Sequence, residues 1–170
     1  MESIDMIRVA LLLLALATSA CSSTFYTESN DEVRITFGGG GMINSKVRQY
    51  AEIRAKEKKV VIDGQVISAD AFLAFSIPGA CYTKNAVFSP HAASYLGVWP
   101  AREMTLNLTH MLPVPLREWF KGHHAYYDWI MFPTVEYEEL YRIWPAGACT
   151  EDDIRVSMRA ATASEAIMFQ

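Results

Sequence analysis

The sequence has no excess of positive charge and no apolar run long enough to span a bilayer. It holds 15 basic and 19 acidic side chains, a formal net charge of −4. Nucleic acid is therefore not an expected partner, because phosphate backbones require a cationic surface. The 170 residues are 51% hydrophobic and 20% charged, which excludes a collagen-like, low-complexity or disordered chain and fits about one domain. The sequence also has no internal repeat and no coiled-coil pattern.

Much of the apolar character lies near the N-terminus, where residues 7–20 carry one charged side chain, Arg8. This segment is shorter than the roughly 20 residues of a transmembrane helix, and it ends in small residues, as signal peptidase sites do. We therefore expect residues 1–20 to be an export signal. A buried N-terminal helix is the alternative.

The segment Thr18-Ser19-Ala20-Cys21 resembles a bacterial lipobox, whose cysteine is lipid-modified and becomes the new N-terminus. The resemblance implies a lipid on Cys21, attachment to a membrane, and a location in the periplasm or cell envelope. Cleavage by an ordinary signal peptidase, with no lipid, is the alternative.

Export also bears on the two remaining thiols. In an oxidising periplasm Cys81 and Cys149 are expected to form a disulfide. The alternative is that both are buried, unreactive cysteines.

The pattern after the export signal predicts an α/β domain over residues 33–149. Residues 21–32 are polar and irregular, which predicts a flexible tether. Residues 33–37 alternate as in a strand, and four glycines at 38–41 follow directly, which indicates a close approach of the backbone to another group.

A helix over 42–57 and a buried strand at 60–62 complete a βαβ unit, with a turn at Asp63-Gly64. Its two strands should be parallel and its crossover right-handed. Val47 and Tyr50 lie on the apolar face of this helix, and Lys46 is expected on another face.

The rest of the domain is predicted to be mostly helical. A helix should begin at Ser68, and a strand at 85–88 should end before His91. The expected C-terminal half is helical and aromatic, with helices at 102–111, from Pro115 through 120, and from Thr134 to about 144. Residues 150–170 are expected to be a C-terminal helix or tail.

The glycine run, Ser68 and His91 fall at predicted strand ends or helix starts, where open α/β sheets place their sites. A serine becomes a nucleophile when a base removes its proton and amides stabilise the oxyanion that forms. His91 could supply the base. The amides of Gly39 or Gly40 and of Ala69 could supply the oxyanion hole. The structural alternatives are a serine that only caps its helix and a histidine with no chemical role.

The order of these motifs resembles the Clp-type serine proteases of the crotonase superfamily. The segment Gly64-Gln65-Val66-Ile67-Ser68-Ala69-Asp70-Ala71 matches the family's nucleophile segment, preceded by the glycine loop and followed by His91. The resemblance covers about residues 33–149 and is closer to small exported Clp-like proteins, which share the two cysteines. It implies a Clp/crotonase-like parallel sheet built from βαβ units, with Ser68 as nucleophile and His91 as base.

The resemblance also implies a carboxylate that orients His91, and Asp128 is the best match. Asp70, Glu103 and Glu136 are the alternatives. Asp70 departs from the family pattern, because a charge two residues after the nucleophile would raise the pKa of a nearby histidine and disturb the oxyanion site.

These features predict an exported serine hydrolase, a peptidase acting on peptide or protein substrates without an ATP-driven partner. The alternative is a non-catalytic envelope lipoprotein that binds a peptide or protein. Loops at 95–100 could line a peptide groove, and a homo-oligomer is possible. We expect no cofactor and no metal site, because His110, His123 and His124 lack zinc-ligand spacing.

Overall fold

The computed structural model describes residues 23–95, 98–130 and 132–150. The expected export signal, the expected lipid on Cys21 and the expected tail after Thr150 lie outside these residues. The elements in chain order are β1 (Thr24–Glu28), β2 (Glu32–Gly38), α2 (Ile43–Ala55), β3 (Lys59–Ile67), α3 (Ala69–Phe75), β4 (Cys81–Tyr82), β5 (Val87–Ser89), β6 (Ser94–Tyr95), β7 (Trp99–Pro100), α4 (Arg102–Met111), α5 (Val114–Gly122), η1 (His124–Tyr126), α6 (Tyr137–Ile143) and η2 (Pro145–Gly147).

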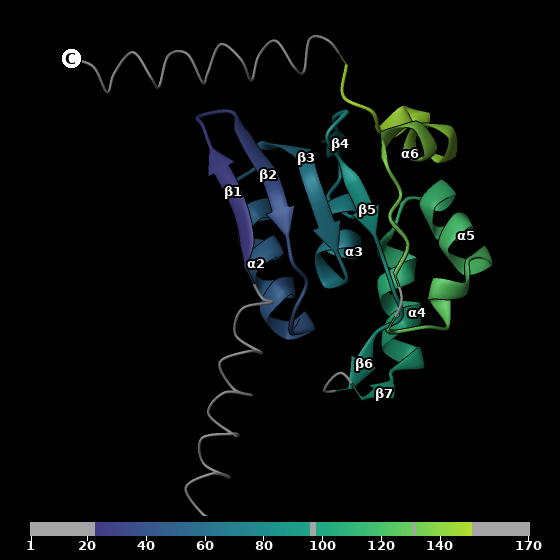
Figure 1. The fold of residues 1–170 in the computed structure, drawn as a ribbon. Helices are drawn as coiled ribbons and strands as arrows, with labels where there is room; N and C mark the ends of the chain where they lie inside the picture. The colour runs from purple at the N-terminus through teal and green to yellow at the C-terminus, as the bar shows by residue number, and fades with distance from the viewer. Residues whose placement is uncertain (1–22, 96–97, 131, 151–170) are drawn as a thin grey trace, which may run out of the picture.

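The main sheet is mostly parallel, which confirms the expected α/β class. Strand β1 pairs with β2 in antiparallel orientation, and β2 pairs with β3 in parallel orientation. Strand β3 then has two further parallel partners, β4 beside its first half and β5 beside its second half (Figure 1). The carboxyl ends of β2, β3 and β5 therefore lie along one edge of the sheet.

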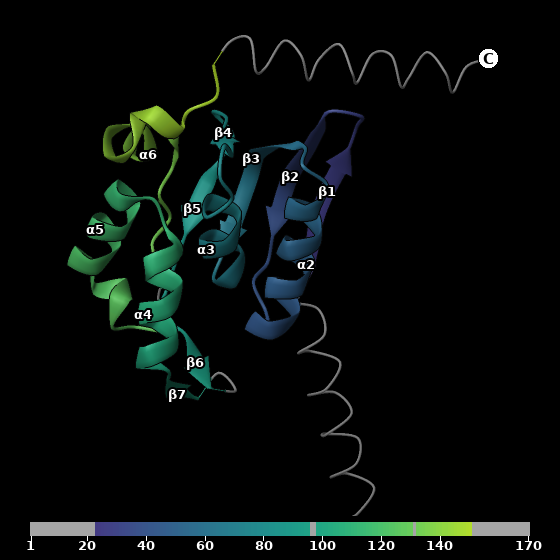
Figure 2. The same cartoon turned by 180° about the vertical axis from the view of Figure 1, so that it is seen from behind.

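Helices α2 and α3 cover one face of this sheet, behind it in Figure 1 and in front of it in Figure 2. Every residue of α3 is buried, including Phe72 and Phe75, whose rings lie 5.3 Å from Phe120 and 5.0 Å from Phe88. Helix α3 packs on α2 and on α4, so it joins the βαβ part to the helical C-terminal half. This burial fixes the position of the residue that precedes α3, Ser68.

Strand β1 occupies residues 24–28 of the segment predicted to be a tether, so that prediction is wrong for these residues. The segment Thr-Phe-Tyr-Thr-Glu combines β-branched and aromatic side chains, which favour strands, and its backbone bonds to the edge of β2. Polar composition misled the prediction because β1 is an edge strand with mostly exposed side chains.

Strand β3 also runs further than predicted, through the expected turn at Asp63-Gly64. A Cβ on Gly64 would lie 1.9 Å from the backbone oxygen of Thr36, so glycine is required there by the approach of β2 and not by a turn. The pairing register of β2 and β3 shifts at this point.

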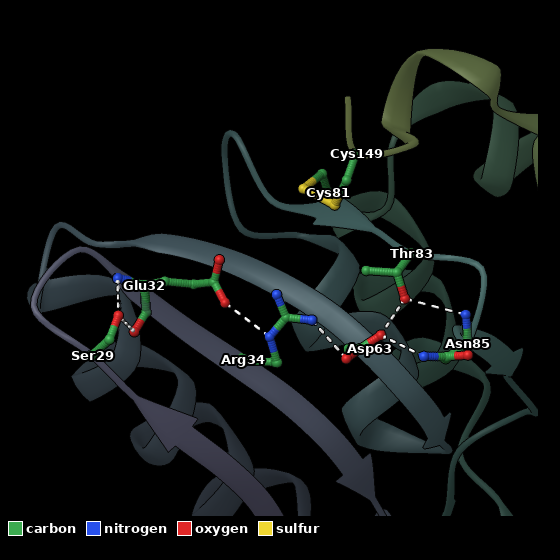
Figure 3. Close-up of polar contacts among 8 residues, drawn as sticks. All are labelled: Ser29, Glu32, Arg34, Asp63, Cys81, Thr83, Asn85 and Cys149. Atoms are coloured by element: carbon green, nitrogen blue, oxygen red, sulfur yellow. Dashed lines mark hydrogen bonds and ion pairs between the residues drawn. A yellow bond between two sulfur atoms is a disulfide. The ribbon is translucent and has the colours of Figure 1, made fainter. Parts of the chain in front are cut away.

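A row of polar side chains crosses β2 and β3 on the face opposite the helices (Figure 3). Arg34 lies between Glu32, 2.9 Å away, and Asp63, 2.6 Å away. Thr83 and Asn85 also donate hydrogen bonds to Asp63. Burial alone would raise the pKa of Asp63, but these hydrogen bonds from Thr83, Arg34 and Asn85 outweigh it and leave the pKa below its usual range.

Cys81 and Cys149 form a disulfide, which confirms the expected pairing (Figure 3). Their Cα atoms lie 4.9 Å apart although the residues are 68 positions apart in the chain. The Cys149 amide also donates to the Tyr82 carbonyl over 2.9 Å, so the chain after η2 extends the sheet beside β4. The bridge therefore closes the helical half onto the first half of the fold.

Replacing both bridge cysteines, Cys81→Ala with Cys149→Ala, should lower the free energy of unfolding by about 2–4 kcal/mol, because the unfolded chain loses a long closed loop. Urea unfolding measures the change. Cys21→Ser is the matched control and should leave the unfolding midpoint in place. Equal midpoints for the wild type and the double variant would contradict a stabilising bridge.

Candidate functional site

Three neighbouring strands bring the predicted site segments to one edge of the sheet. The glycine loop follows β2, Ser68 follows β3, and His91 lies two residues beyond the end of β5. Ser68 is tied directly to β5, because its amide donates to the Ser89 carbonyl over 3.0 Å. The structure therefore gathers Gly39, Gly40, Ser68 and His91 at the same edge.

Ser68 has an unusual backbone conformation, with φ of 56° and ψ of −126°. A positive φ is uncommon for a residue that carries a side chain, and such conformations cluster at functional sites. Ser68 precedes α3, but its hydroxyl does not cap the helix. It makes no side-chain hydrogen bond to any described residue, so the structure does not realise the simple capping role.

The glycine loop lies directly against this serine, as the four glycines predict. A Cβ on Gly40 would lie 2.7 Å from the Ser68 Cβ and 3.2 Å from its Oγ, and Gly40 itself has a φ of 78°. A Cβ on Gly38 would lie 2.6 Å from the Cβ of Asp70. Larger residues at either position would push the loop away from Ser68 and α3.

Asp70 holds the loop and α3 together from inside the protein. Its side chain is fully buried, and Oδ2 accepts the Gly40 amide over 2.7 Å and lies 3.0 Å from Lys46 Nζ. Oδ1 accepts the Thr24 hydroxyl over 2.8 Å. Lys46 is 2% exposed and also donates to Thr24 Oγ1. Burial and the Asp70 charge both raise the pKa of Tyr50, which therefore stays protonated.

Lys46 is a residue whose importance the sequence analysis missed. It lies on the buried side of α2 with Tyr50 and Ile53, whereas Val47, assigned to the apolar face, is substantially exposed. The sequence contains a signal for this: Lys46, Tyr50 and Ile53 are spaced by four and three residues, so they lie on one face of the helix. This spacing puts a cation on an apolar stripe. A cation in that position requires a buried anion, and Asp70 supplies it.

The amides proposed for the oxyanion hole are only partly available. Gly39 donates its amide to the Ser23 carbonyl over 3.1 Å, and the Gly40 amide is taken by Asp70. The structure thus does not present Gly39 or Gly40 as oxyanion donors. The amides of Ala69 and Gly41 donate to no group within the described ranges.

His91 is partly buried, and its ring lies 5.4 Å from that of Phe132. Nδ1 lies 2.8 Å from the Ala92 carbonyl, which places the proton on Nδ1 and leaves Nε2 as the acceptor. Burial lowers the pKa of His91 below its ordinary 6.5, and the Ala92 hydrogen bond and the Asp128 charge only partly oppose this. At neutral pH the ring is therefore an uncharged base.

Asp128 lies close to His91, but it is not the hydrogen-bond partner expected for Nδ1. Its backbone carbonyl accepts the Ala92 amide over 3.1 Å, and its Oδ1 accepts the Ile130 amide over 2.8 Å. Of the alternative acids, Asp70 is paired with Lys46, and Glu103 and Glu136 are exposed at the starts of α4 and α6. Asp128 is the carboxylate that acts electrostatically on His91.

No hydrogen bond joins Ser68 to His91 in the described structure. Catalytic hydrogen bonds are often long in unliganded enzymes and tighten when substrate binds. A cavity of about 320 Å³ is lined by Ala92, the residue after His91, and by Pro100, Arg102, Thr105, Tyr126 and Tyr127, whereas neither His91 nor Ser68 lines it. It is large enough for one side chain and includes Pro100, the end of the loop expected to line a groove.

The described residues contain no group of three or more His, Cys, Asp and Glu side chains placed to share a metal ion. Within the same ranges, no helix has the length and apolar character needed to cross a membrane. Comparison of the chain with family models, curated proteins and solved structures finds no match.

Replacing Lys46 by methionine should destabilise the protein by about 3–5 kcal/mol, because the buried Asp70 carboxylate loses its cation. Urea unfolding measures this loss. The double variant Lys46→Met with Asp70→Asn should be less destabilised than Lys46→Met alone, since no uncompensated charge remains.

The matched control is Arg48→Met, an exposed position two residues along α2, which should change stability by about 0.5 kcal/mol or less. If Lys46→Met behaves like Arg48→Met, the ion pair does not stabilise this part of the fold.

Proposed function

We propose that the chain is an exported serine hydrolase, a peptidase in which Ser68 is the nucleophile and His91 the base. The observation that carries the proposal is the conformation of Ser68. It lies on a strained turn between β3 and α3, its hydroxyl bonds to none of the described residues, and the glycine loop packs against it. Nucleophilic serines on strand-to-helix turns are held in such strained conformations in other hydrolases.

The proposed reaction begins when Ser68 Oγ attacks an acyl carbon and its proton passes to His91 Nε2. The protonated ring then donates that proton to the leaving group, as in other serine hydrolases. The Ala92 carbonyl holds Nδ1, and the Asp128 charge stabilises the imidazolium that forms. Ala69 is the amide that remains for the oxyanion, with Gly41 in place of the occupied Gly39 and Gly40.

The order of site segments supports a Clp/crotonase-like arrangement. In that family a glycine loop, a serine after the next strand and a histidine after a further strand form the site. Here the same order follows β2, β3 and β5 at one sheet edge. The cavity lined by Ala92, the residue after His91, would take one side chain of a peptide or protein substrate.

A non-catalytic role, binding a peptide or protein partner in the envelope, is the second candidate. The observation that favours it is the hydrogen bond from the Gly40 amide to Asp70. A loop whose amides are already satisfied stabilises an oxyanion poorly, because removing a single oxyanion donor slows catalysis by about 10²–10³-fold in other serine hydrolases.

Labelling with a fluorophosphonate probe separates the two candidates. The wild type should be labelled covalently at Ser68, and Ser68→Ala should lose all labelling. Ser76→Ala is the matched control, because Ser76 ends the same helix with its hydroxyl bonded to Leu73, and it should be labelled like the wild type. No labelling of the folded wild type would favour the binding role, and equal labelling of Ser68→Ala would exclude Ser68 as nucleophile.

The rate of this labelling should fall at acid pH with a midpoint below 6.5. The reason is that burial lowers the pKa of His91, so the neutral base persists to lower pH than in an exposed histidine. Asp128→Asn should move the midpoint lower still, because the Asp128 charge raises the pKa of His91. A midpoint at or above 6.5, or an upward shift in Asp128→Asn, would contradict this assignment of the base.

A further inference from the structure

The chain enters the fold at the same sheet edge that holds Ser68. The Ser23 carbonyl accepts the Gly39 amide, and the next glycine, Gly40, packs against Ser68. Cys21 is only two residues before Ser23, and two extended residues span at most about 7 Å. Because β1 replaces the expected tether, a lipid on Cys21 would hold this edge close to the bilayer surface.

Large apolar side chains are exposed along this part of the molecule. Tyr95 and Trp99 lie opposite each other on the β6–β7 ribbon and are 54% and 64% exposed. Tyr127, Ile130 and Phe132 follow η1 and are 75%, 66% and 47% exposed. We call these five residues the apolar rim.

Both parts of the rim lie near the segment that carries His91. Phe132 lies against the His91 ring, and the Ala92 amide bonds to the carbonyls of Ala125 and Asp128. The β6–β7 ribbon begins at Ser94, two residues after Ala92 (Figure 1). The rim and the point of chain entry therefore lie toward the same edge of the sheet, the edge formed by the carboxyl ends of the parallel strands.

We propose that the apolar rim docks this edge of the sheet onto a lipid bilayer. Three of the five side chains are Tyr or Trp, whose apolar rings and polar tips suit the boundary between headgroups and acyl chains. The five rim side chains are uncharged, so the proposed docking rests on apolar contact. The proposal rests on the expected membrane anchor and is independent of whether Ser68 is a nucleophile.

A second set of exposed apolar residues serves as an internal control. Val114 begins α5 and Tyr141 lies in α6, near the end of the fold that carries the disulfide (Figure 1). These positions match the rim in exposure and apolar character, but they lie away from the chain entry. They should remain in water when the rim is docked.

The test uses the full chain in its membrane-attached form, in phosphatidylcholine vesicles whose acyl chains are brominated near the headgroup. Bromine quenches tryptophans that reach this depth. We expect clear quenching in the wild type and a smaller loss of fluorescence in Trp99→Phe, in which Trp129, between the rim residues Tyr127 and Ile130, still approaches the bilayer. Trp144→Phe, a change near the disulfide end, should leave the absolute loss of fluorescence as in the wild type.

The double variant Tyr127→Ser with Ile130→Ser should also reduce quenching at least twofold, whereas Val114→Ser with Tyr141→Ser should not. Urea midpoints verify that each variant is folded. Quenching that is absent in the wild type, or unchanged in both rim variants, would overturn the proposal, as would a wild-type chain that stays in the aqueous fraction. Fluorophosphonate labelling in detergent is read separately, so a failure of catalysis does not count against docking.

Discussion

The buried carboxylate of Asp70 is the group on which the arrangement of the site depends. It bonds to the glycine loop through Gly40, to β1 through Thr24 and to α2 through Lys46, while belonging to α3 itself. A fully buried carboxylate is tolerated only when its charge and its lone pairs are matched. These three partners and Asp70 itself come from four parts of the chain, so the contacts that satisfy Asp70 also assemble this edge of the sheet.

The same carboxylate restricts the chemistry of the site. By accepting the Gly40 amide, Asp70 draws the loop toward the core and against Ser68, but it removes that amide from the oxyanion position. The hydrogen bond that positions the loop therefore also prevents the Gly40 amide from acting as an oxyanion donor. A hydrolase built this way would depend on the amides of Ala69 and Gly41, which separates it from sites whose first loop glycine faces the substrate.

Much of the fold could be predicted because its signals are local. Alternation predicted β2, helical spacing predicted α2, and the glycine run predicted a close contact that Gly38 and Gly40 both make. The disulfide could be predicted from the expected export of the chain. The face of α2 could not, because Lys46 reads as a solvent-exposed cation until the anion that pairs with it, 24 positions along the chain, is known.

Other features depended on contacts between distant segments. Strand β1 looked like a tether because an edge strand is polar and its partners lie on β2. Gly64 looked like a turn because the approach of Thr36 is invisible in the sequence. The grouping of Ser68 with His91 could be predicted, since residues that follow parallel strands meet at one edge. The hydrogen bond of His91 to the Ala92 carbonyl, in place of a carboxylate, could not.

The conformation of Ser68 favours a chemical role over a structural one. A strained positive φ costs of order 1–3 kcal/mol, and a glycine at this position would avoid most of it. A hydroxyl that capped α3 could offset the strain, but Ser68 makes no cap hydrogen bond. Its backbone contributions, the amide to Ser89 and the carbonyl accepting from Ala71, would be made equally by glycine. What glycine would lack is the hydroxyl itself, so stability alone does not account for the serine.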